Sequence, residues 1–151
     1  MALVYDATLV RSATTYPVGN EGWGLSLDAA HHRWVQSDGT NVLTFRDESN
    51  FAVVGHRPVT LSGKPATRLN ELEVVGNSVW ANVWKTNVID RIDLATGVVT
   101  ETVALGRLVP KGIIDTDSVL NGIAHRPGDP LTRLWVTGKR WPTMYEIRIS
   151  R

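Results

Sequence analysis

Three short segments, each centred on an asparagine, recur along the chain at a nearly constant interval. The asparagines are Asn20, Asn70 and Asn121, so they are 50 and 51 residues apart. A repeat of this length, built from one small supersecondary unit, is typical of propellers and other repeat arrays. This period is the strongest constraint that the sequence places on the fold.

Within each repeat, short runs rich in Val, Ile, Thr and aromatic residues alternate with turn dipeptides such as Asp38-Gly39, Gly76-Asn77 and Thr96-Gly97. This pattern is typical of antiparallel strands. It predicts two strands in residues 1–18, followed by units of four, four and three strands. The units cover residues 19–67, 68–118 and 119–151, and we expect them to form a single partial propeller domain. The connection 106–118 is compatible with a short helix or an ordered loop.

Four-stranded antiparallel units repeated around an axis form a β-propeller, which usually needs about four to eight blades to close. This chain supplies about three blades. Its last unit lacks an outer strand, and the segment Leu9 to Val18 resembles an outer strand without a blade. We therefore expect an all-β propeller fragment that forms a homodimer. Each copy would complete the last blade of the other, which closes a six-bladed ring with two-fold symmetry.

The composition argues against several classes of function. Sixteen basic and fifteen acidic residues leave a net charge of +1, which provides no electrostatic footprint for nucleic acid or for a membrane surface. No apolar run has the length of a membrane-spanning helix, and the first residues lack the features of a secretory signal, so the default expectation is a cytoplasmic protein. Cysteine is absent and the four histidines show no ligand spacing, so we expect no metal and no cofactor.

Three tryptophans begin the second strand of their units and align with one another. We expect packing between blades for this set, which comprises Trp34, Trp80 and Trp135. The alignment places Asp38, Trp84 and Lys139 at equivalent positions, just past the second strand. Three chemical types at one backbone position could mark a functional rim or ordinary variation at a turn, and the pattern alone leaves both open.

With these residues the chain resembles the plant and bacterial type of glutaminyl cyclase, or glutamine cyclotransferase, a family of five-bladed propellers. The matching stretches follow one another in family order and include residues 21–25, 37–40, 69–73, 80–86, 119–124, 136–142 and 145–147. The resemblance covers the chain from about residue 19 to its C-terminus. Enzymes of the family cyclise an N-terminal glutamine, whose α-amine attacks the side-chain amide and expels ammonia.

The resemblance implies a central pocket that takes a small ligand or a peptide N-terminus. Trp23 and Trp84 would form its apolar walls, and Asn70 and Lys139 would be polar anchors. It also favours a pocket position for Trp141. From the residues alone, the asparagines could instead cap turns, and Lys139 could be a solvated lysine.

The chain departs from the family pattern at its beginning. Family members carry further blades before the Gly-Trp-Gly-Leu motif, including the region of the catalytic carboxylate, and the corresponding motifs are absent here. We therefore expect only the C-terminal three blades and little cyclase activity, unless Glu21 or Glu71 takes the acid–base role. Glu71 and Glu73 share one side of a strand, which is more typical of solvent-facing carboxylates.

Three functions remain open at this point. The first is a pocket-bearing or ring-forming scaffold that binds a ligand at its central mouth. The second is an active glutaminyl-peptide cyclotransferase that forms N-terminal pyroglutamate. The third is an assembly unit without a ligand.

Overall fold

The computed structural model describes residues 1–19, 21–112 and 115–150, and in these ranges the fold is all-β apart from two 3₁₀ helices, η1 (Ala29–His31) and η2 (Gly106–Leu108). Asn20, one of the three repeat asparagines, lies outside the described residues. The described part of the chain contains no helix with the length and apolar character needed to cross a bilayer.

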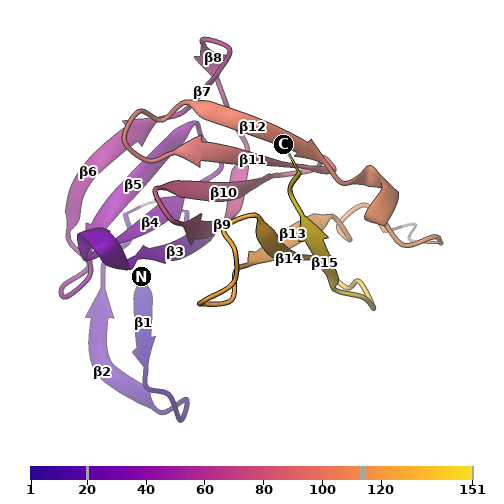
Figure 1. The fold of residues 1–151 in the computed structure, drawn as a ribbon. Coiled ribbons are helices and arrows are strands. Elements are labelled where there is room, and N and C mark those ends of the chain that lie inside the picture. The colour runs from indigo at the N-terminus through magenta and orange to yellow at the C-terminus, as the bar shows by residue number, and fades with distance from the viewer. Residues whose placement is uncertain (20, 113–114, 151) are drawn as a thin grey trace.

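Three antiparallel sheets follow one another along the chain, and in each of them neighbours in sequence are neighbours in space (Figure 1). The first sheet consists of β3 (Gly24–Asp28), β4 (Arg33–Ser37), β5 (Val42–Asp47) and β6 (Val53–Pro58). The second consists of β9 (Leu69–Val75), β10 (Ser78–Val83), β11 (Val88–Asp93) and β12 (Val99–Ala104). The third consists of β13 (Leu120–Ala124), β14 (Arg133–Gly138) and β15 (Tyr145–Arg148).

Two hairpins accompany these sheets. The N-terminal hairpin pairs β1 (Ala2–Tyr5) with β2 (Arg11–Tyr16), and a smaller one pairs β7 (Thr60–Leu61) with β8 (Lys64–Pro65). The predicted order of two, four, four and three strands is therefore confirmed, but the β7–β8 hairpin was missed. Its turn, Ser62-Gly63, has positive φ at both residues, which is the type I′ conformation that suits a tight hairpin. Serine is an uncommon residue for that conformation, so the dipeptide Ser62-Gly63 does not stand out in the sequence as a hairpin turn.

Two apolar cores hold the sheets together, and the second sheet lies between them. Val79, Ala81 and Ile92 pack toward the first sheet, whereas Trp80 and Ile89 pack in the core shared with the third. Because both faces of the second sheet are covered, β10 is buried at five successive positions. The outer strand β12 instead begins with the buried Val99 and then alternates between exposed and partly buried residues, as a half-covered strand does.

The inner strands β3, β9 and β13 lie next to one another, with β9 in the middle. β3 approaches β9 closely at Gly24, where an added Cβ would overlap the carbonyl oxygen of Asn70. Close backbone approach of this kind requires glycine. The loop after β4 makes a second contact between the first two sheets. The N–H of Gly39 donates to the carbonyl of Leu69, and the carbonyl of Gly39 accepts from the N–H of Arg68. The inner edges of the sheets thus converge on one region.

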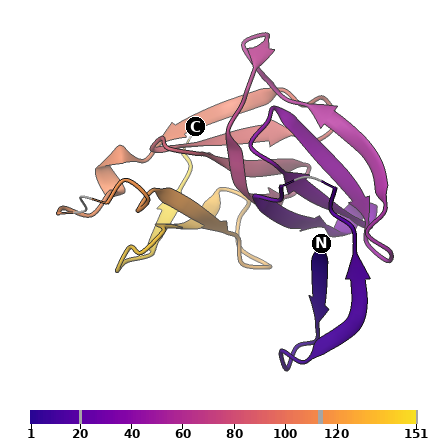
Figure 2. The ribbon, with the colours of Figure 1, turned by 180° about the vertical axis from the view of Figure 1, so that it is seen from behind.

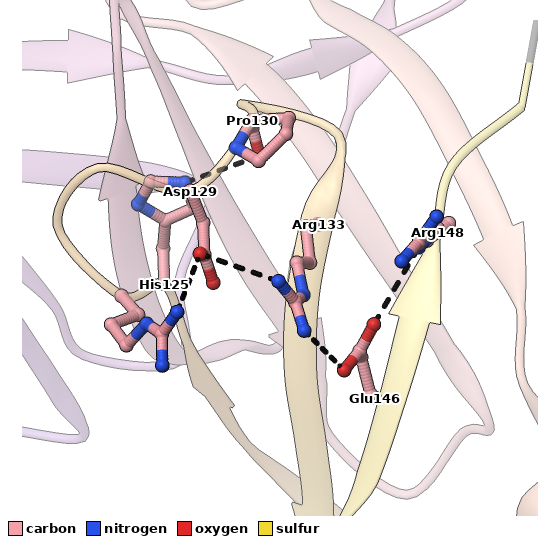
Figure 3. Close-up of polar contacts among 7 residues, drawn as sticks. His125, Asp129, Pro130, Arg133, Glu146 and Arg148 are labelled. Atoms are coloured by element: carbon pink, nitrogen blue, oxygen red, sulfur yellow. Dashed lines mark hydrogen bonds and ion pairs between the residues drawn. The ribbon is translucent and has the colours of Figure 1, made fainter.

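Charged side chains tie together the third sheet and the loop before β14 (Figure 3). Arg133 lies between two carboxylates, 3.4 Å from Asp129 Oδ1 and 2.6 Å from Glu146 Oε2. Arg148 approaches the other oxygen of Glu146 at 3.5 Å. The hydrogen bond from Arg133 lowers the pKa of the Glu146 carboxyl. The Arg133–Glu146 pair links β14 to β15, and the Arg133–Asp129 pair fixes the loop before β14, so these charges are part of the scaffold.

The N-terminal hairpin projects away from the three sheets in both views (Figures 1 and 2). The segment expected to be an outer strand without a blade is β2, and it pairs with β1. The chain just after it is attached to the first sheet, because Arg46 donates to the carbonyl of Val18 at 2.7 Å and Tyr16 stacks on Phe51 with ring centroids 5.7 Å apart. Several apolar side chains of the hairpin stay exposed, among them Leu3, Tyr5, Leu9 and Val10.

Candidate functional site

A hollow of about 470 Å³ opens where the inner strands converge, and residues from all three repeats line it. Its lining comprises Glu21, Gly22, Trp23, Asn70, Trp84, Asn121 and Lys139. All four of the expected ligand-binding residues therefore lie around one cavity, although they are separated by up to 116 positions in the sequence, from Trp23 to Lys139. Glu21, one of the two candidate acid–base residues, lines the same cavity.

Two of these residues occupy equivalent places in their sheets, as the repeat alignment predicts. Trp84 directly follows β10 and Lys139 directly follows β14. The backbone N–H of Trp84 donates to the carbonyl of Arg68 at 2.8 Å, and the N–H of Lys139 donates to the carbonyl of Val119 at 2.9 Å. Each acceptor immediately precedes the inner strand of the same sheet. The same backbone bond therefore holds both side chains at the mouth of the hollow.

The apolar part of the lining is a pair of tryptophans from different sheets. The rings of Trp23 and Trp84 meet edge to face, with centroids 5.1 Å apart and planes at 72°. The loop residue Gly39 leaves room for the Trp23 ring, since a Cβ there would lie 2.7 Å from it. On the other side, the Lys85 ammonium lies 4.7 Å from the centroid of the Trp84 ring. Both rings are half-buried, so they present apolar surface to the cavity.

The two asparagines of the lining lie in β-bulges of their inner strands. In the second sheet Leu69 pairs with Val83 and Leu72 with Ala81, so β9 has one residue more than β10 between these pairs. In the third sheet Leu120 pairs with Gly138 and Ile123 with Val136, so β13 has the same extra residue. A bulge bends a strand and changes the direction of its side chains, and bulges are common next to functional sites. Asn70 and Asn121 are the first residues inside the two bulges.

Glu71, the other candidate acid–base residue, is not among the residues that line the hollow. Its carboxylate oxygen Oε2 accepts the backbone N–H of Ile123, in the third sheet, at 2.8 Å. Burial, with a smaller contribution from the charge of Glu73, raises the pKa of the Glu71 carboxyl to about 8. Glu73 makes the corresponding contact one step along the strand, where it accepts the N–H of His125 at 2.9 Å. The expectation that this pair faces solvent is therefore wrong, because both carboxylates join two sheets.

The remaining tryptophans separate into different environments. Trp80 is buried between the second and third sheets, as expected. Trp34 and Trp135 are only partly buried, so the expectation of core packing holds for one of the three. Trp141, expected at the pocket, lies in the core with Trp80 and donates its Nε1–H to the carbonyl of Ser118 at 2.9 Å.

Asn121 was not among the residues predicted to bind a ligand, although it lines the hollow. The signal was present in the sequence, because Asn121 stands one repeat after Asn70. From the residues alone these asparagines could equally cap turns, and the bulges that bring them to the hollow have no local sequence signature. In the described part of the chain, no group of three or more His, Asp or Glu side chains is arranged to hold a metal ion.

Comparisons with known proteins agree on one family. Residues 1–149 match the family described as Glutamine cyclotransferase. The chain is 36% identical over 135 residues to the glutaminyl-peptide cyclotransferase of Arabidopsis thaliana, a match that covers 87% of this chain and 41% of the relative.

Solved structures show the same relationship. The glutaminyl cyclase of Myxococcus xanthus superimposes with a TM-score of 0.82 at 39% identity, covering 92% of this chain and 59% of that one. The β-propeller domain of Cps50 (Swd1) from Myceliophteria thermophila superimposes with a TM-score of 0.53 at 12% identity, covering 97% and 44%, which indicates likeness of fold alone. The chain thus spans 41% and 59% of the lengths of the two cyclase relatives.

Proposed function

Because the chain belongs to the glutamine cyclotransferase family, we propose that its hollow binds the N-terminal glutaminyl residue of a peptide. The observation that carries the proposal is the convergence of Trp23, Trp84, Asn70 and Lys139 on one cavity. In this role the chain acts as a pocket-bearing propeller fragment that holds the glutaminyl group without cyclising it.

The chemistry of the lining suits this ligand. A glutaminyl side chain is an apolar stem that ends in an amide, so two aromatic faces can enclose the stem while polar groups bind the amide. The asparagine amides offer both donors and acceptors, and Lys139 offers a cationic donor to a carbonyl oxygen. Binding by such groups fixes the folded conformation that brings the α-amine near the side-chain amide.

The binding proposal is tested by titrating the chain with a glutaminyl dipeptide while the tryptophan fluorescence is followed. We expect Trp84→Ala and Lys139→Ala to weaken binding by about tenfold or more, which corresponds to the loss of one well-placed contact. Trp80→Ala, a substitution in the core that does not alter a lining residue, is the control for effects on stability. If the two lining variants lose folding stability but bind the dipeptide as the wild type does, the residues are structural.

The second candidate is an active glutaminyl-peptide cyclotransferase, and the position of Glu21 in the lining favours it. A carboxylate at the cavity can move the proton between the attacking amine and the departing ammonia. Incubation with a glutaminyl peptide, followed by mass spectrometry, separates the candidates through the loss of one molecule of ammonia. Product that forms with the wild type and not with Glu21→Gln would establish this activity, whereas bound but unchanged peptide supports the first candidate.

We further propose that about three blades per chain are completed by a second copy, which gives a six-bladed ring. Two features of the described residues support this. The first sheet and the N-terminal hairpin carry exposed apolar side chains, including Leu25 and Val54, and β15 pairs on one edge only. Joining the first repeat of one copy to the last repeat of the other would cover both features and enclose the hollow.

A further inference from the structure

We propose that Glu71 is a positioning residue for the glutaminyl pocket: its carboxyl group holds the bulge of β13 in the shape that presents Asn121 to the ligand. The inference rests on the proposed function for the ligand, but its structural part stands independently of it. Glu71 itself contacts no ligand, because it lies outside the lining of the hollow. It acts through the backbone of the neighbouring sheet.

The first step in the argument is the bulge itself. The extra residue in β13 lies between the pairs Leu120–Gly138 and Ile123–Val136, so Gly122 is inside the bulge and Ile123 is the residue that closes it. Buried N–H groups without acceptors are costly, so a bulge in this position needs acceptors from elsewhere. Both come from side chains of the second sheet: Gly122 N–H donates to Asn82 Oδ1 at 2.9 Å, and Ile123 N–H donates to Glu71 Oε2 at 2.8 Å.

The second step is reciprocity between the two bulges. The backbone N–H of Glu71, inside the bulge of β9, donates to Asn121 Oδ1 at 3.4 Å. Glu71 thus accepts from the bulge of β13 with its side chain and donates to that bulge with its backbone. Because Asn121 Oδ1 is engaged in this way, its Nδ2 group is the part of the amide that remains for a ligand. The contact therefore determines how the amide is oriented as well as where it lies.

The third step is the difference between the two equivalent positions. Gly122 occupies in β13 the place that Glu71 occupies in β9. A Cβ at Gly122 would lie 2.8 Å from the Thr137 methyl carbon, so β13 has no room for a side chain that could support its own bulge. The carboxyl group of the preceding repeat supplies that support instead. The Ser37 hydroxyl does the same for the bulge of β9, since it donates to the Asn70 carbonyl at 2.5 Å.

Glu73 is a control within the same strand. It lies two residues from Glu71, on the same side of β9, and it accepts a backbone N–H of the third sheet at nearly the same distance. Its donor is His125, beyond the end of β13 and outside the lining of the hollow. A general role in joining the sheets predicts similar effects for both carboxylates. A positioning role predicts an effect on the pocket for Glu71 alone.

The experiment compares Glu71→Ala, Glu71→Gln and Glu73→Ala with the wild type by NMR and by titration with a glutaminyl dipeptide. We expect Glu71→Ala to lose hydrogen-exchange protection at the Ile123 amide, to shift the Asn121 side-chain amide resonances, and to weaken dipeptide binding by about tenfold. Glu71→Gln keeps a carbonyl acceptor and should restore all three. Glu73→Ala should lose protection at the His125 amide while its Asn121 resonances and dipeptide affinity stay as in the wild type.

Two results would overturn the inference. One is a folded Glu71→Ala variant with unchanged Asn121 resonances, and the other is Glu73→Ala with the same pocket defects as Glu71→Ala. Failure of the wild type to bind the dipeptide would refute the proposed function instead. In that case the exchange of Ile123 and the Asn121 resonances still decide whether Glu71 shapes the bulge.

Discussion

At the scale of single residues, Gly24 is a tight backbone contact, where the inner strands of the first two sheets meet. Gly24→Ala should destabilise the fold by about 1 to 3 kcal/mol, because the new methyl group overlaps the Asn70 carbonyl and backbone cannot move aside easily. Gly55→Ala is the matched control: it too lies in a strand, and its Cβ would meet only the Phe45 ring at an ordinary 3.6 Å. Urea unfolding of the two variants measures the difference, and equal losses would contradict the close approach.

The raised pKa of Glu71 leads to a prediction about pH. Between the ordinary value of 4.5 and the folded value of about 8, the folded chain keeps a proton that the unfolded chain has released. Stability therefore falls as pH rises through this window, by at most about 1.4 kcal/mol per pH unit for this one group. Two other titratable groups lie nearby, Glu73 and His125. Burial also raises the pKa of the Glu73 carboxyl, and the charge of His125 acts in the opposite direction.

Glu71→Gln removes this proton without removing the acceptor, so the variant should gain stability relative to the wild type as pH rises from about 5 to 8. Denaturant unfolding of both proteins at several pH values provides the measurement. Because Glu73 and His125 are present in both proteins, their contributions largely cancel in the difference. Stability curves that run parallel across this range would show that Glu71 does not titrate there.

At the scale of elements, one buried arginine attaches the N-terminal segment to the first sheet. Arg46 is 4% exposed and donates to Gln36 Oε1 at 2.5 Å, to the Phe51 carbonyl at 3.1 Å and to the Val18 carbonyl at 2.7 Å. Arg46→Met keeps the apolar stem and removes all three bonds. We expect a loss of about 2 to 4 kcal/mol, since the acceptors stay buried without donors.

The same substitution should detach the N-terminal hairpin before the sheets unfold. Limited proteolysis is the direct measurement, with faster cleavage between β2 and β3 in Arg46→Met than in the wild type. Arg33→Met is a suitable comparison, because Arg33 lies in the same sheet but binds Asp28 at 2.9 Å instead of the N-terminal segment. Equal cleavage rates in the two variants would show that Arg46 is not the attachment.

At the scale of the whole molecule, the proposed ring predicts self-association through the N-terminal hairpin and the first sheet. Sedimentation at micromolar concentration should show a dimer, and Leu9→Lys combined with Val10→Lys should convert it to a folded monomer, because both side chains are more than 60% exposed. Leu61→Lys, on the small β7–β8 hairpin, is the control and should leave the dimer intact. A compact wild-type monomer would exclude the ring.

The repeat period, the strand order and the cluster of Trp23, Asn70, Trp84 and Lys139 could be predicted from the amino-acid sequence. Each depends on local patterns or on matching motifs. A turn dipeptide ends the strand that immediately precedes it, and equivalent positions in successive repeats occupy equivalent places in space. The positions of Trp84 and Lys139, each one residue past a second strand, illustrate this most directly.

The roles of Glu71, Asn121 and Trp141 depended on contacts between sheets. Alternation along β9 correctly places Glu71 and Glu73 on one side, but that side faces solvent or a neighbouring sheet according to how the sheets stack. The bulges that bring Asn70 and Asn121 to the hollow arise from pairing between strands, which leaves no mark in either strand alone. Glu71 is buried because the third sheet, some 50 residues further along the chain, packs against β9. This packing turns a carboxylate that the sequence places at the rim into a support for the pocket.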